Sequence, residues 1–217
     1  MYTSPLYNPP MFRETRPEEL GGLMAAHPLA VLVTISSQGL GASHLPLLFD
    51  AAEGPLGVLR GHMARANQQW REYTAASEAL AIFSGPEHYI SPNWYVSTKE
   101  SGKVVPTWNY ITVHVRGTLT FTTDAAWLLE NVRALTNEHE KMMSKPWRVE
   151  DAPPEYIGKM LEAIVGVELA ITAIEGKWKV SQNRALEDRI SAVAGLESVA
   201  TPEAVQMAQL VKQALPK

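Results

Sequence analysis

The chain of 217 residues contains no cysteine. This absence excludes disulfides, zinc ribbons, iron–sulfur clusters and cysteine nucleophiles. Long apolar runs are missing as well, because no stretch approaches the roughly 20 apolar residues that a membrane-spanning helix needs. Residues 1–16 hold three prolines and no apolar run, so they do not resemble a signal peptide. We therefore expect a cytoplasmic protein without a membrane partner.

Positive charge is also scarce, since the formal net charge is −4. Nucleic-acid binding depends on a basic face, so direct DNA binding is doubtful. A residual basic patch of Lys177, Lys179 and Arg189 is the remaining candidate for it. The helix expected from Pro202 carries only two cations, Lys212 and Lys217, which is too few for a recognition helix.

Several catalytic and metal-binding motifs are missing. The chain has no phosphate-binding loop ending in Gly-Lys-Ser/Thr, no Gly-x-Gly-x-x-Gly after a strand and no Gly-x-Ser-x-Gly. His139-Glu140 begins like a zinc-protease helix, but Met143 stands where the second histidine ligand is required. We predict no metal site, and whether the protein is an enzyme stays open.

The hydrophobic pattern predicts an α+β protein built on a small antiparallel barrel. An early hairpin favours antiparallel pairing, and no regular strand–helix alternation occurs. We expect about six strands, at 29–35, 40–49, 56–61, 80–85, 108–121 and 167–173, the last one turning at Glu175-Gly176. We expect helices at 17–27, 65–74, 124–139, 153–164, 186–196 and 202–215. Residues 1–217 would form one domain, with a helical C-terminal extension from about 185.

The first candidate site is Gly61-His62-Met63-Ala64-Arg65-Ala66-Asn67, expected between a strand and a helix. Glycine allows a ligand to approach the backbone, and a helix start offers free N–H groups. Arg65 could hold a phosphate with two hydrogen bonds. The alternative is a surface arginine beside a capping turn.

The second candidate lies at the end of a long irregular stretch, 86–106, which is typical of functional or interface loops. Lys103 supplies a positive charge, Asn109 a donor and an acceptor, and Trp108 and Tyr110 flat faces. These groups could surround a planar heterocycle. Simple packing in the barrel or in a dimer interface is the alternative.

The third candidate is Ser181-Gln182-Asn183-Arg184, directly after a strand. Four polar residues at a strand end could form the rim of a ligand site. They could equally cap the helix expected from Leu186, and their composition favours that interpretation.

A series of short motifs in the sequence resembles the PaiB-type family of FMN-binding negative transcriptional regulators. The resemblance runs in order through nearly the whole chain. The fragments that carry it include His44-Leu45-Pro46, the segments 61–67 and 103–110, Tyr89-Ile90-Ser91-Pro92, Pro146-Trp147 and Lys179 followed by the segment 181–184. Gln68 departs from it, since relatives tend to have proline there. The resemblance implies the split β-barrel of pyridoxamine-phosphate-oxidase-like flavoproteins, and a homodimer with FMN at the subunit interface.

The resemblance and the residues together suggest a provisional arrangement of FMN. The phosphate would meet Arg65 and the backbone from His62 through Met63 to Ala64, with Asn67 in the same motif. The ring or ribityl side would contact Lys103, Trp108 and Asn109. The site would be closed by Ser181, Gln182 and Arg184, either from the same subunit or from the second one. The function would be transcriptional regulation or redox sensing. The alternatives are a flavin-dependent oxidoreductase acting on a small substrate and a haem-binding split barrel.

Overall fold

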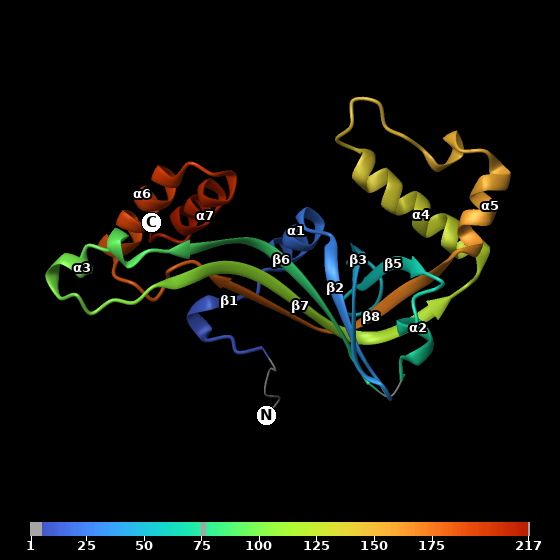
Figure 1. Cartoon of the computed structure of the whole chain (residues 1–217), viewed down its shortest axis with the longest axis horizontal. Helices are drawn as coiled ribbons and strands as arrows, with labels where there is room; N and C mark the ends of the chain where they lie inside the picture. The colour runs from blue at the N-terminus through green and yellow to red at the C-terminus, as the bar shows by residue number, and fades with distance from the viewer. Residues whose placement is uncertain (1–5, 75–76, 217) are drawn as a thin grey trace. The chain divides into compact units, whose positions relative to one another are not determined.

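The computed structural model describes residues 6–74 and 77–216 (Figure 1). Its strands form one sheet in the order β3-β2-β6-β7-β8-β5-β4, and β1 also pairs with β8. The pairs β1–β8, β2–β3, β2–β6, β4–β5 and β5–β8 are all antiparallel. The prediction of an antiparallel α+β architecture is therefore confirmed.

The strands are β1 Arg13–Glu14, β2 Leu29–Ser36, β3 Gly39–Pro46, β4 Leu48–Asp50, β5 Val58–Ala64, β6 Ala79–Ile90, β7 Thr107–Thr122 and β8 Ile164–Lys179. The α-helices are α1 Pro17–Ala26, α2 Gln69–Glu72, α3 Ser97–Glu100, α4 Ala125–Glu140, α5 Pro154–Glu162, α6 Leu186–Val199 and α7 Pro202–Gln213. Short 3₁₀ helices lie at η1 Pro10–Phe12, η2 Pro92–Trp94 and η3 Val149–Asp151.

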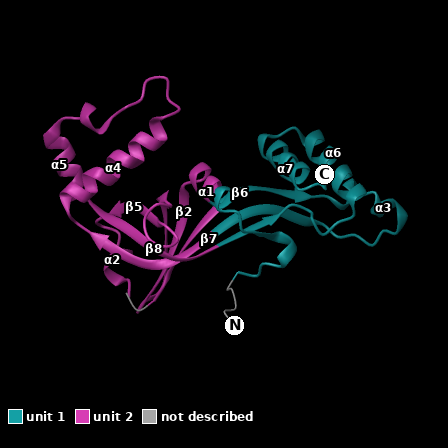
Figure 2. Cartoon of the chain, turned by 180° about the vertical axis from the view of Figure 1, so that it is seen from behind, with its two compact units in different colours: residues 1–20, 84–113, 175–217 teal, residues 21–83, 114–174 magenta. Residues whose placement is uncertain are grey.

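The chain divides into two compact units (Figure 2). Unit 1 contains residues 1–20, 84–113 and 175–217, and unit 2 contains 21–83 and 114–174. The long strands β6, β7 and β8 each contribute residues to both units. The core of unit 1 includes Tyr95, Leu196 and Met207, and the core of unit 2 includes Leu32, Leu59, Phe83, Leu128 and Leu169. The single-domain description stays a prediction.

Two helix starts follow the capping rules that the sequence suggested. The Asp124 carboxylate accepts a hydrogen bond from the Trp127 N–H at 2.8 Å, so α4 begins at Ala125. The Thr201 hydroxyl accepts from the Ala204 N–H at 3.3 Å at the start of α7. The segment 181–184 does not cap α6. The N-cap residue is Ala185, whose side chain makes no capping hydrogen bond.

The strands differ from the prediction in number and length, since the described residues form eight. β5 continues to Ala64, and β8 runs through Glu175-Gly176 without turning. Gly176 suggested a turn in the sequence, but in the structure it lies within β8. A Cβ at Gly176 would lie 2.3 Å from Leu20 Cδ2 and 2.9 Å from the Glu14 carbonyl oxygen, so this residue allows a close approach within a strand.

The helix expected at 65–74 is reduced to the single turn of α2. Asn67 Oδ1 accepts a hydrogen bond from the Gln69 N–H at 2.9 Å, which turns the chain before the helix begins. The stretch 86–106 is less irregular than expected, because it contains the end of β6 together with η2 and α3.

A buried side chain fastens α2 to β2. Gln69 is 8% exposed, and its Nε2 donates to the Leu32 carbonyl oxygen and to Thr34 Oγ1, both at 3.0 Å. We predict that Gln69→Ala lowers the free energy of unfolding by about 1–3 kcal/mol, because buried acceptors lose their donor. Urea denaturation measures this change.

The neighbouring Gln68 provides the control, because it is exposed and its amide donates only to the nearby Ala66 carbonyl oxygen. Gln68→Ala should change stability by less than about 0.5 kcal/mol. Equal effects of the two substitutions would contradict the structural role of Gln69.

Candidate functional site

The residues proposed from the sequence form two groups, one in each unit. Unit 2 holds the first group, His62, Met63, Ala64, Arg65 and Asn67. Unit 1 holds the second group, Lys103, Trp108, Asn109, Ser181, Gln182 and Arg184.

The first group lies between a strand and a helix, as expected, because β5 ends at Ala64 and Arg65 and Asn67 belong to the turn that leads into α2. The Arg65 N–H donates to the Ala163 carbonyl oxygen at 2.8 Å. This hydrogen bond continues the register in which β5 pairs with β8, so the Arg65 amide points toward β8. Successive amides of a strand point to opposite edges. The His62 and Ala64 amides therefore point to the β4 side, where pairing with β4 ends at Arg60.

The Arg65 side chain is half-buried and lies across the start of β8. Its Nε and Nη2 both donate to the Ile164 carbonyl oxygen, but at 3.4 Å these contacts are long and weak. Among residues 6–74 and 77–216, no carboxylate forms an ion pair with Arg65. The guanidinium is positioned by the backbone and retains its capacity to bind an anion.

Two other members of this group have structural partners. Met63 is 2% exposed and belongs to the core of unit 2. Asn67 Nδ2 donates to Ser43 Oγ at 2.8 Å, while its Oδ1 accepts from the Gln69 N–H at 2.9 Å, so both ends of the amide are engaged. Their contact with a ligand stays a prediction.

His62 faces α4 and an apolar cleft. Its Nδ1 lies 3.4 Å from Asn131 Nδ2, and the cleft of about 240 Å³ that it lines is bounded by residues such as Trp147, Tyr156 and Met160. Burial lowers the pKa of His62 from its ordinary value of 6.5. The ring is therefore neutral at pH 7.

In the second group, Asn109 and Ser181 bond to each other. Asn109 Nδ2 donates to Ser181 Oγ at 2.9 Å, and the two residues are 1% and 2% exposed. Ser181 has a φ of 68°, a left-handed conformation that is uncommon for residues other than glycine. The buried Asn109 amide thus stabilises the turn that follows β8.

Gln182 and Arg184 are also held locally. Gln182 Oε1 accepts from the Val180 N–H at 2.8 Å, and its Nε2 donates to the Trp178 carbonyl oxygen at 2.6 Å. The Arg184 guanidinium lies 4.7 Å from the centre of the Tyr95 ring. The cation–π contact holds the Arg184 guanidinium against the Tyr95 ring.

Lys103 and Trp108 are the exposed members of the second group. Trp108 is 54% exposed, and its ring meets that of Tyr89 edge to face, with centroids 6.1 Å apart. Sequence reasoning did not assign Lys179 to the site, yet its Nζ donates to the Trp108 carbonyl oxygen and to Thr107 Oγ1. Its position at the end of a strand whose neighbour carries Trp108 could have suggested this contact.

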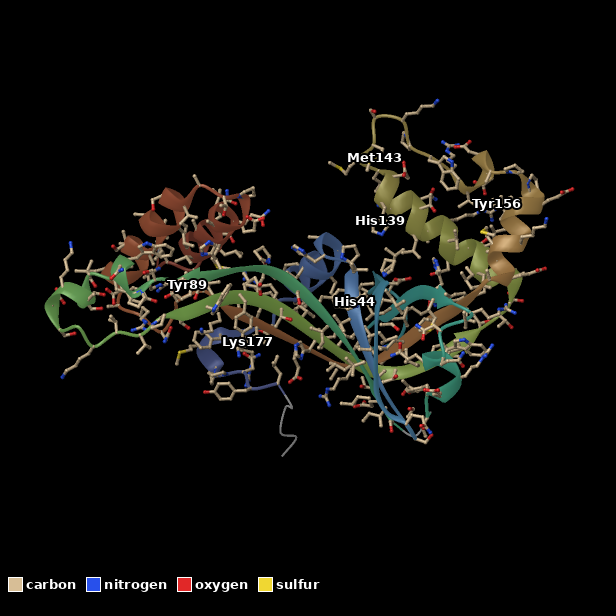
Figure 3. All side chains as sticks on the ribbon, viewed as in Figure 1. His44, Tyr89, His139, Met143, Tyr156 and Lys177 are labelled. Carbon is tan, nitrogen blue, oxygen red and sulfur yellow. The ribbon has the colours of Figure 1, made fainter. Side chains whose placement is uncertain are left out.

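The residual basic patch of Lys177, Lys179 and Arg189, left open by the sequence, does not form, because two of its three cations are buried. Lys177, labelled in Figure 3, is 6% exposed and donates to the Tyr7 carbonyl oxygen at 2.7 Å. Arg189 is 8% exposed and donates to the Ala214 carbonyl oxygen after α7. These two cations serve packing within unit 1 and offer no exposed surface to DNA.

Neither a metal centre nor a membrane span is found where the chain is described. No group of three or more potential His, Asp or Glu ligands gathers in residues 6–74 and 77–216. Within the same ranges, no helix has the length and apolar character needed to cross a membrane.

The buried His62 ring makes stability depend on pH. The unfolded chain binds a proton at His62 more readily than the folded protein does, so stability is retained above about pH 6.5 and falls as the pH drops below it. We predict that His62→Gln reduces the loss in free energy of unfolding between pH 7 and pH 5. Denaturation curves across this range would measure it.

His139 provides the matched control, since it is an exposed histidine on α4 (Figure 3). His139→Gln should keep the pH dependence of the unsubstituted protein. If both variants behaved alike, the burial of His62 would not control this part of the pH profile.

Comparison with known proteins identifies the family. Residues 6–173 match the family model described as "Putative FMN-binding domain". The chain is 32% identical over 212 residues to the protease synthase and sporulation protein PAI 2 of Bacillus subtilis, covering 98% of this chain and 99% of that protein. It is 33% identical over 226 residues to an uncharacterized protein of Emericella nidulans, covering 88% of this chain and 90% of that one.

Solved structures share the fold at low sequence identity. The flavocytochrome Anf3 from Azotobacter vinelandii superposes with a TM-score of 0.58 at 16% identity, covering 77% of this chain and 69% of that chain. The FAD and heme binding protein from Mycobacterium smegmatis gives a TM-score of 0.57 at 16% identity, covering 82% and 79%. These similarities confirm the split-barrel fold. The family model and the Bacillus subtilis relative show that the chain belongs to the PaiB-type family of flavin-binding split-barrel proteins.

Proposed function

We propose that the protein binds FMN and that its phosphate is held at the end of β5. The observation that carries the proposal is the Arg65 guanidinium, which has only long contacts to one carbonyl oxygen and no ion pair with a described carboxylate. The His62 and Ala64 amides on the β4 side of β5 would add neutral donors. A phosphate bound there would gain charge-assisted hydrogen bonds that a neutral ligand cannot make.

Within unit 1, the second group has the chemistry expected for contacts with the flavin ring and ribityl chain. Trp108 offers a half-exposed flat face, Lys103 a solvent-exposed cation and Arg184 a guanidinium held against the Tyr95 ring. Asn109 and Ser181 would act through the turn that they stabilise, with Gln182 at its rim. FMN is favoured over FAD because the sequence has no dinucleotide fingerprint.

We further propose that the flavin serves a regulatory or redox-sensing role in a homodimer. The name of the Bacillus subtilis relative refers to protease synthesis and sporulation, which supports a regulatory role. Tyr89 and Trp108, 41% and 54% exposed, are aromatic side chains of the kind enriched in interfaces. The absorption spectrum of protein purified without added cofactor is the first test, since flavin and haem have different visible bands.

The phosphate contact can be tested by Arg65→Ala. We predict a loss of FMN affinity of roughly tenfold to a hundredfold, as expected for removing a charge-assisted hydrogen bond worth about 1.5–3 kcal/mol. Riboflavin lacks the phosphate, so its affinity should barely change. Quenching of flavin fluorescence measures both.

Arg71 provides the control, because it lies near Arg65 in sequence but its guanidinium stacks on Trp70 at 5.0 Å. Arg71→Ala should leave FMN affinity unchanged. If Arg65→Ala weakened FMN and riboflavin equally, Arg65 would support the fold and not the phosphate.

The homodimer is tested separately. We predict that light scattering after size exclusion reports about twice the mass of one chain at micromolar concentration. A monomer under these conditions would contradict a flavin site shared between subunits, and the Arg65 result would then refer to a site within one chain.

A further inference from the structure

A second cleft in unit 2 is lined by aromatic and acidic side chains, whereas a phosphate site needs positive charge. It measures about 580 Å³, within the range of small-molecule sites, and lies between α4, β4 and β5. Phe49 and Trp127 supply aromatic walls, while Asp50, Arg60, Glu130 and Asn131 supply polar groups. None of these residues belongs to either of the groups proposed from the sequence.

Glycine contacts hold the aromatic walls in place. A Cβ at Gly57 would lie 2.4 Å from Phe49 Cε2, so the Phe49 ring lies directly against that backbone. A Cβ at Gly166 would lie 2.3 Å from Trp127 Cζ3, so the Trp127 ring lies directly against β8. The walls are therefore preformed, which reduces the entropy that a ligand must lose to bind between them.

The side-chain carbonyl oxygen of Asn131, a residue that lines this cleft, lacks a hydrogen-bond partner among the described residues. Asn131 is 5% exposed, and its Nδ2 is on the His62 side, 3.4 Å from the ring nitrogen. Its Oδ1 is buried as well. Because this oxygen is not exposed, the polar surface that the cleft offers to a ligand comes from the side chains of Asp50, Arg60 and Glu130.

The lining of the cleft has an excess of negative charge, because Asp50 and Glu130 supply two carboxylates and Arg60 supplies one guanidinium, and partners outside the lining do not reverse it. Arg60 is already neutralised, because its Nε lies 2.7 Å from Glu168 Oε2 and its Nη2 lies 2.7 Å from Glu53 Oε1. Asp50 lies 3.9 Å from the same guanidinium. Glu130 lies 3.8 Å from Arg133, whose Nε is held at 2.6 Å by Glu150.

Two guanidinium groups thus face five carboxylates in these pairs. The potential of such a cleft attracts cations and repels phosphates. An electronegative cleft with aromatic walls is also suited to cation–π contact, which is strongest on tryptophan.

We propose that this cleft binds a small organic cation, an amine or amidine with an apolar or aromatic body. The body lies against Phe49 and Trp127, and the charged N–H groups face the Asp50 and Glu130 carboxylates. This ligand differs in charge from FMN, so the proposal does not depend on where the flavin binds.

Three probes of similar shape and different charge test the proposal. Benzylamine is cationic at pH 7, benzyl alcohol is neutral and benzoate is anionic. Titration calorimetry on the purified full chain, with its flavin content measured, should give binding in the order benzylamine, benzyl alcohol, benzoate. Benzoate binding as tightly as benzylamine, or no binding of benzylamine, would overturn the proposal.

Variants of the same protein locate the binding. Asp50→Asn and Glu130→Gln are exposed isosteric changes, and each should weaken benzylamine roughly two- to fivefold, as expected for a partly screened ion pair. Ala134→Trp places a large side chain in the cleft from an exposed position on α4 and should abolish binding. Glu138→Gln, also on α4 but outside the cleft, is the control and should change nothing.

Two outcomes separate this proposal from the flavin proposal. If Asp50→Asn, Glu130→Gln and Ala134→Trp all left benzylamine affinity unchanged, the cleft would not be its site and the inference would be wrong. FMN affinity should be unaffected by Asp50→Asn and Glu130→Gln, because a site that depends on Arg65 gains nothing from these carboxylates. A loss of FMN affinity in these two variants would assign the cleft to flavin and also overturn the cation proposal.

Discussion

Strand β8 is the element on which both groups of candidate site residues depend. Its start fixes Arg65, because the Arg65 N–H donates to the carbonyl oxygen of Ala163, just before the strand, and the guanidinium contacts Ile164, its first residue. Its last residues lead into the turn at Ser181, which the buried Asn109 amide holds. The strand can pass closely packed neighbours because Gly166 and Gly176 carry no side chain.

Unit 2 separates charges of opposite sign. At the end of β5, Arg65 is a cation with no carboxylate partner in the described chain, whereas in the cleft beside α4 carboxylates outnumber guanidinium groups. The uncharged His62 ring contacts Asn131, a residue of that cleft. This separation would allow one unit to distinguish an anionic ligand from a cationic one, because each site repels the other ligand.

Burial changes the roles of several polar residues that appear alike in the sequence. Asn109, Ser181 and Asn67 have the chemistry of ligand contacts, yet each is used within the protein to hold a turn. Lys177 and Arg189 have the charge of a DNA-binding patch, but both bind backbone carbonyl oxygens in the interior of unit 1. A side chain engaged in this way contributes to a site by fixing the backbone around it.

The sequence by itself determined the helix starts at Ala125 and Pro202, the β2–β3 hairpin, the antiparallel class and the family. These features depend on local signals: capping side chains, proline positions, alternating apolar residues and an ordered set of short motifs. Tertiary structure alone decided that β5 extends to Ala64 and that β8 passes through Gly176, because a glycine at a close approach between elements looks like a turn in the sequence. It alone brought Phe49, Asp50 and Arg60 together with Trp127 and Asn131, which lie more than 60 residues later in the chain, because α4 packs against β4 and β5. Charge excess and an unpaired buried acceptor are properties of that packing, and no local pattern encodes them.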